Sequence, residues 1–184
     1  MKVYEGPNVR NVSLVGHGDA GKTSLVAAML YTAGATPQMG RVDAGTAPTD
    51  FDEEEQTRAM SISNSLGFAE WGKAKINFVD TPGFNMFVHE AKLAMPAVES
   101  VLVVVDGVSG VEVSTEKAWG YAEEYEMPRV IVGGRMDRER ADAERMLQSV
   151  SEAFGRAVVP VQLPIGKEKN FSGVVDLVKM KAYA

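Results

Sequence analysis

Cysteine is absent from this chain of 184 residues, and histidine occurs only twice. The lack of cysteine excludes a disulfide framework and a thiolate metal site. No uninterrupted apolar run approaches the roughly 20 residues that a membrane-spanning helix needs, and residues 1–10 contain no apolar signal core. We therefore expect a cytoplasmic protein with no membrane partner.

Basic residues are also in the minority. Nineteen Lys and Arg face 25 Asp and Glu, which gives a formal net charge of −6. Such a chain has no overall basic field for nucleic acid, so we expect no DNA partner, and any partner that carries RNA has to be met by local patches or by other domains. The 45% hydrophobic and 24% charged content is typical of a globular chain that buries a core.

A glycine-rich loop over residues 16–23 matches the pattern G-x-x-x-x-G-K-[ST], between an expected strand over residues 9–15 and an expected helix over residues 24–33. Its glycines let backbone N–H groups turn toward an anion, Lys22 can reach the outer phosphates, and the Thr23 hydroxyl can ligate Mg²⁺. A purely structural glycine turn is the alternative. We assign nucleotide binding to Gly16, His17, Gly18, Asp19, Ala20, Gly21, Lys22, Thr23 and Ser24.

A second motif, Asp80-Thr81-Pro82-Gly83, follows an expected strand over residues 74–79. Proteins with a phosphate-binding loop place an acidic Mg²⁺ partner and a turn toward the γ-phosphate at such a strand end. An ordinary surface turn is the alternative, because Pro and Gly are common turn formers. We expect Asp80 to reach Mg²⁺ through water and Gly83 to lie at the phosphates.

The remaining pattern alternates strands and helices. We expect strands over residues 61–71, 101–105 and 129–132, and helices over residues 86–95, 112–126 and 141–154. The strand over residues 61–71 and the strand over residues 74–79 are expected to form an antiparallel hairpin that turns at Gly72-Lys73. This order predicts an α/β fold with a mostly parallel sheet and helices on both faces, followed by a small β-rich unit that begins with strands over residues 158–163 and 174–180. Residues 34–57 are expected to form a long mobile loop, and the acidic run 50–55 to be a solvated face without chemistry.

Several segments together resemble the translation-factor GTPases, elongation factor G most closely, over essentially the whole chain. They are the loop 16–23, Arg58-Ala59-Met60-Ser61-Ile62 where the family usually has R-G-I-T-I, Asp80-Thr81-Pro82-Gly83, and Met136-Asp137-Arg138. Residues 162–166 and 171–177 are similar to the start of an insertion that distinguishes factor G from its relatives. The resemblance implies a P-loop GTP-binding core over residues 1–157 and the beginning of an inserted subdomain over residues 158–184.

The chain departs from the family at two catalytic positions. Ser61 replaces the threonine that binds Mg²⁺ but keeps the hydroxyl, so the resemblance implies a metal site of Thr23, Ser61 and, through water, Asp80. Phe84 replaces the histidine that orients the attacking water. An aromatic residue here resembles a divergent second branch of bacterial factor G. The implied catalytic residues are Lys22, Gly83 and the position of Phe84, and the loss of the histidine predicts hydrolysis slowed by about 10²–10⁴.

A third departure lies in the segment that reads the base, where the family has N-K-x-D and this chain has Gly134-Arg135-Met136-Asp137. Asp137 can accept two hydrogen bonds from guanine, and Arg135 can stack on the base as the lysine does. Gly134 removes an amide that ordinarily hydrogen-bonds the base. An ordinary turn that leads into a helix is the alternative interpretation of Met136-Asp137-Arg138.

The resemblance implies GTP and GDP as ligands, Mg²⁺ as cofactor, and a GTPase that acts on the ribosome in translocation or in ribosome disassembly. We expect contact with the large subunit mainly through domains outside this sequence, which we take to be a fragment, and we expect a monomer. Asp19 either helps to hold a monovalent cation beside the phosphates or interacts with the local helix dipole. The alternatives are a nucleotide-gated binding module without efficient hydrolysis, suggested by Phe84, and an ATP-using P-loop enzyme, which Asp137 disfavours.

Overall fold

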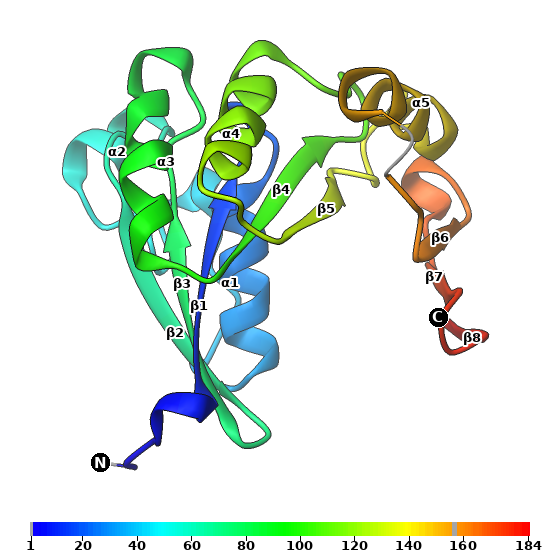
Figure 1. Ribbon diagram of the computed structural model, residues 1–184. Helices are drawn as coiled ribbons and strands as arrows, with labels where there is room; N and C mark the ends of the chain where they lie inside the picture. The colour runs from blue at the N-terminus through cyan, green and yellow to red at the C-terminus, as the bar shows by residue number, and fades with distance from the viewer. Residues whose placement is uncertain (1, 156–157) are drawn as a thin grey trace. The chain divides into compact units, whose positions relative to one another are not determined.

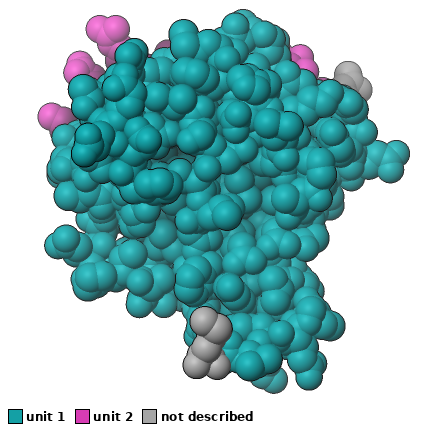
Figure 2. Space-filling model, turned by 90° about the vertical axis from the view of Figure 1, so that its left-hand side faces the viewer, with its two compact units in different colours: residues 1–104, 113–132 teal, residues 105–112, 133–184 magenta. Residues whose placement is uncertain are grey.

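The computed structural model describes residues 2–155 and 158–184, which form two compact units, coloured separately in Figure 2. Unit 1 comprises the residues up to 104 together with 113–132, and unit 2 comprises residues 105–112 and 133–184. The expected boundary between residues 157 and 158 falls at positions outside the described residues. The division into a core over residues 1–157 and a subdomain over residues 158–184 therefore stays a prediction.

A five-stranded sheet in the order β2-β3-β1-β4-β5 forms the framework (Figure 1). Its strands are β1 (Val9–Val15), β2 (Ser65–Trp71), β3 (Ala74–Asp80), β4 (Ser100–Asp106) and β5 (Arg129–Gly134). The central strand β1 pairs in parallel with β3 and β4, whereas β2 is antiparallel to β3. The predicted hairpin is confirmed, and it turns at Gly72, which has a φ of 60°. Ligands bind outside the carboxyl ends of such parallel strands.

Helices cover both faces of the sheet, as predicted. The helices of unit 1 are α1 (Lys22–Thr32), α2 (Glu53–Arg58), α3 (Val88–Ala94) and α4 (Val113–Glu124), and unit 2 contains α5 (Ala143–Phe154). Phe78 of β3 packs in one cluster with Val26 and Leu30 of α1, and the next residue, Val79, packs in another with Ala94 of α3. Because side chains alternate along a strand, α1 and α3 lie on opposite faces (Figure 1). Among the described residues no helix has the length and apolar character needed to span a bilayer.

The structure corrects three expectations. The expected mobile loop over residues 34–57 contains a 3₁₀ turn, η2 (Val42–Ala44), and most of helix α2. The first hairpin strand begins at Ser65 and not at residue 61, because the backbone N–H groups of Ile62 and Ser63 bond the side chain of Glu55 and not a neighbouring strand. The expected helix over residues 86–95 is shorter, since 3₁₀ turns η3 (Asn85–Phe87) and η4 (Met95–Ala97) flank α3, and Pro96 cannot continue an α-helix.

Unit 2 contains a small three-stranded antiparallel sheet, so the prediction of a β-rich element near the end of the chain is confirmed. Its strands are β6 (Gln162–Ile165), β7 (Gly173–Asp176) and β8 (Lys181–Tyr183). The expected strands over residues 158–163 and 174–180 have different limits. Strand β7 ends at Asp176 because its carboxylate accepts the N–H groups of Val178 and Lys179 at 2.9 and 2.8 Å, which closes a turn.

Candidate nucleotide and metal site

The glycine-rich loop connects β1 to α1, as its sequence predicts. Gly16 has a φ of 139° and Gly21 a φ of 97°, conformations that favour glycine. A Cβ atom on Gly16 would lie 2.2 Å from the carbonyl oxygen of Val104, so no side chain fits there. Ala20, within the loop, is fully buried. Asp19 is exposed, with a φ of 61°, and Ser24 is exposed in the first turn of α1.

Lys22 is buried and tied to the loop that precedes it. Its Nζ donates to the carbonyl oxygens of Gly16 at 3.2 Å and His17 at 2.7 Å. An ammonium group has three donors, so one donor stays for a phosphate oxygen. Burial lowers the pKa of Lys22 to about 8. The negative charges of Asp80 and Asp19 raise this pKa, but their effect is smaller than that of burial. An anion bound beside the ammonium group would favour the charged form.

The predicted metal ligands lie together at the start of α1. The hydroxyl oxygens of Thr23 and Ser61 are 3.4 Å apart. Asp80 Oδ2 accepts a hydrogen bond from Thr49 at 2.9 Å, whereas the buried Oδ1 has no hydrogen-bond partner among the described residues. Burial raises the pKa of Asp80. The nearby hydroxyls of Thr23 and Thr49 and the charge of Lys22 act in the opposite direction and lower this pKa. Two hydroxyls beside a half-satisfied carboxylate fit a hard divalent cation that takes oxygen ligands.

The Asp80–Phe84 turn lies against the glycine-rich loop. A Cβ atom on Gly83 would be 2.2 Å from Lys22 Nζ and 2.4 Å from the His17 carbonyl oxygen, so only glycine allows this approach. A Cβ atom on Gly18 would be 3.0 Å from the ring of Phe84. The candidate catalytic residues Lys22, Gly83 and Phe84 thus lie at one place in unit 1.

His17 is buried and contacts helix α4. Its backbone N–H donates to Thr115 Oγ1 at 3.3 Å, and its ring Nδ1 lies 3.1 Å from the same hydroxyl. Thr115 is fully buried. Thr115 thus holds the glycine-rich loop against α4. The local sequence around residue 115 does not indicate this role.

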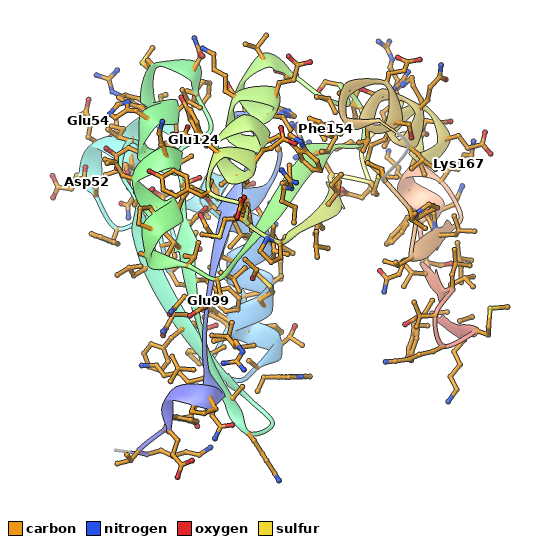
Figure 3. The ribbon with its side chains drawn as sticks, viewed as in Figure 1. Asp52, Glu54, Glu99, Glu124, Phe154 and Lys167 are labelled. Atoms are coloured by element: carbon orange, nitrogen blue, oxygen red, sulfur yellow. The ribbon has the colours of Figure 1, made fainter. Side chains whose placement is uncertain are left out.

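The acidic run 50–55 is not a uniformly solvated face, so that expectation is wrong. Asp52 caps α2 by accepting the N–H of Glu54, and both residues lie at the start of this helix (Figure 3). Asp50 and Glu55, however, are 5% and 2% exposed. Glu55 Oε1 accepts the N–H groups of Ile62 at 2.7 Å and Ser63 at 3.1 Å. It thereby holds the backbone that follows Ser61.

Asp50 is the other buried member of this run. Neither of its carboxylate oxygens has a hydrogen-bond partner among the described residues. Burial, and after it the charge of Glu55, raises the pKa of Asp50. Its neighbour Thr49 bonds Asp80, so the buried part of the run adjoins the phosphate site. The spacing Asp52-x-x-Glu55 is typical of a capping box and was the available signal for α2.

The candidate base-reading segment belongs to unit 2. Asp137 is exposed and accepts no hydrogen bond from the residues that the structure describes, so its carboxylate is available to a base. Arg135 has a φ of 55°, and its Nη1 donates to Asp106 Oδ2 at 2.9 Å. The other oxygen of Asp106 accepts the N–H groups of Val108 at 2.6 Å and Ser109 at 3.3 Å. Asp106 is thus a functional candidate that no sequence motif indicated.

The chain is similar to known proteins in sequence and in fold. Residues 7–183 match the family described as the elongation factor Tu GTP binding domain. The chain is 39% identical over 176 residues to an elongation factor G-like protein of Thermotoga maritima, with 96% of this chain and 25% of that protein covered. It is 37% identical over 180 residues to elongation factor G of Rhodopseudomonas palustris, with 98% and 26% covered.

A crystal structure of a protein from Thermus thermophilus has the same fold, with a TM-score of 0.90 at 33% identity over 97% of this chain and 27% of the other. The chain therefore spans about a quarter of the length of these relatives. The resemblance to translation-factor GTPases and the P-loop fold are confirmed. The chain belongs to the elongation factor Tu GTP-binding domain family of translational GTPases.

Proposed function

We propose that this chain is the GTP-binding domain of an elongation factor G-like GTPase that acts on the ribosome, and that it hydrolyses GTP to GDP and phosphate. The observation that carries the proposal is the convergence of Lys22, Thr23, Ser61 and Asp80 on the glycine-rich loop. These groups supply one cation, two hydroxyls and one carboxylate at the end of a central strand. That is the set a nucleoside triphosphate with Mg²⁺ requires.

Each residue has a separate task in the proposed reaction. The loop N–H groups and the third donor of Lys22 bind the β- and γ-phosphates, and Thr23 and Ser61 provide inner ligands for Mg²⁺. Asp80, with its buried Oδ1, would hold the metal through water. Mg²⁺ held there would stabilise the negative charge that develops on the phosphates. Asp137 accepts from the guanine edge, and Arg135 covers the base.

Phe84 is the residue that we expect to slow the hydrolysis of GTP. Its ring has no group that can orient or deprotonate water, so we expect slow hydrolysis unless a ribosomal group or a backbone carbonyl of the turn orients the water. Replacing Phe84 by His should raise ribosome-stimulated hydrolysis about tenfold or more while GTP affinity stays nearly constant. Pre-steady-state hydrolysis by both proteins at saturating ribosomes measures this. Equal rates would mean that Phe84 does not limit turnover.

A nucleotide-gated binding module is the second candidate function, and Phe84 is the observation that favours it. Such a module distinguishes GTP from GDP but does not turn over efficiently. Single-turnover release of phosphate from the full-length protein, with and without ribosomes, separates the two functions. Stimulation by ribosomes supports the GTPase, and background rates under both conditions leave only the module.

The remaining assignments rest on the family. We propose a monomer in the cytoplasm with no membrane or DNA partner, and a ribosomal contact made mainly through the large subunit by parts of the protein outside this chain. Asp19, exposed on the loop, is the proposed ligand for a monovalent cation. A GTPase rate that is the same in potassium and sodium buffers would remove that role.

A further inference from the structure

Gly18 differs physically from the other glycines of the phosphate loop. Gly16 and Gly21 have positive φ angles, but Gly18 does not, so its backbone suits any residue. The three atoms nearest to a Cβ built on Gly18 are Cε1, Cζ and Cδ1 of Phe84, at 3.0, 3.0 and 3.1 Å. These contacts are closer than a methyl group accepts without movement of the ring. A side chain at position 18 would therefore require the Phe84 ring to move by a few tenths of an ångström.

The backbone on each side of Phe84 makes contacts that fix the position of this residue. Gly83, immediately before it, lies directly against Lys22 and the His17 carbonyl. Immediately after it the 3₁₀ turn η3 begins, and the carbonyl oxygen of Phe84 accepts the N–H of Phe87 at 2.9 Å. Phe84 itself is only partly buried. Two consecutive residues, Gly83 and Phe84, thus rest on the loop, one through its backbone and one through its ring.

We propose that Phe84 and Gly18 are a matched pair, in which the ring anchors the Asp80–Phe84 turn on the phosphate loop and makes Phe84 a positioning residue for the terminal phosphate. The proposal rests on the function proposed above and deepens it. Because Gly83 lies against Lys22 Nζ, the group that we assign to the outer phosphates, the anchor should act on GTP and have little effect on GDP, which has no γ-phosphate.

A double-mutant cycle in the full-length protein tests the pair. Gly18→Ala, Phe84→Ala and the double variant are compared by calorimetry for GDP and for a non-hydrolysable GTP analogue. We expect Gly18→Ala to weaken the GTP analogue about tenfold, because the added methyl group displaces the ring, and to change GDP affinity less than about twofold. In the Phe84→Ala background, Gly18→Ala should have no further effect.

Gly120→Ala is the matched control, because a Cβ on Gly120 in α4 meets no atom within 4 Å. Its affinities should equal those of the unmodified protein. The lack of a further loss in the Phe84→Ala background also separates the pair from general misfolding, because independent damage from the two substitutions would add. Equal losses from Gly18→Ala in both backgrounds, or for both nucleotides, would overturn the proposal. If the unmodified protein binds neither nucleotide, the proposed function itself fails.

Discussion

Glu55 provides the sharpest test of how the metal site is assembled. Its Oε1 accepts two backbone N–H groups, from Ile62 and Ser63, immediately after Ser61. A hydrogen bond to a charged group stabilises a structure by about 1.5–3 kcal/mol. Because both N–H groups share one acceptor oxygen, we take the two bonds together to contribute about 3 kcal/mol. Since about 1.4 kcal/mol corresponds to a factor of ten, Glu55→Ala should weaken GTP binding by about ten- to a hundredfold. If Ser61 acts only when the γ-phosphate is present, the affinity for GDP should be affected little.

Calorimetry with GDP and a non-hydrolysable GTP analogue measures this difference. Glu55→Gln keeps a carbonyl acceptor and should lose only a few-fold of the GTP affinity. The control is Glu54→Ala, because Glu54 is exposed and its ion pair with Arg58 is a surface contact worth about 0–1 kcal/mol. An equal loss of GTP and GDP affinity in Glu55→Ala would show that Glu55 supports the fold and not the position of Ser61.

Three further results are expected of the full-length protein. Lys22→Ala should abolish nucleotide binding, since it removes a charge-assisted donor to the phosphates, and calorimetry with an unchanged GDP affinity would contradict the loop assignment. Asp137→Asn should weaken GTP and shift preference toward xanthine nucleotides, because an amide donates where the carboxylate accepts; competition binding measures this, and retained guanine preference would point to another group. Because the pKa of Lys22 is lowered to about 8 and a bound phosphate raises it, GDP affinity should fall up to about tenfold from pH 7 to pH 9. Lys22→Arg, which keeps its charge, should not show this fall.

The sequence predicts the central part of the fold because its signals are local. The strand before the glycine-rich loop, the hairpin at Gly72 and the buried strand before Asp106 follow from short apolar runs and turn residues. Helix α2 is not predicted, because its six residues have no apolar stripe and its buried residue is the charged Glu55. Burial of a carboxylate depends on distant backbone donors, which no periodicity encodes.

The candidate site also contains residues that the sequence predicts and residues that only the structure reveals. Lys22, Thr23 and Asp80 belong to motifs with fixed spacing, so their convergence could be predicted. Gly18 occupies a position that the loop motif leaves open, and only the ring of Phe84, 66 residues later in the chain, explains it. Asp106 likewise bonds Arg135 across 29 residues. Contacts between a motif and a residue outside it require the tertiary structure.

The three departures from the family pattern each have a partner residue. Ser61 keeps its hydroxyl 3.4 Å from Thr23 and is followed by backbone that Glu55 holds. Phe84 lies on Gly18, and Arg135, which follows Gly134, is held by Asp106. A contact in which both members are adapted to each other makes the effect of changing one member depend on the other. The free energy of each departure is therefore a property of a pair of residues.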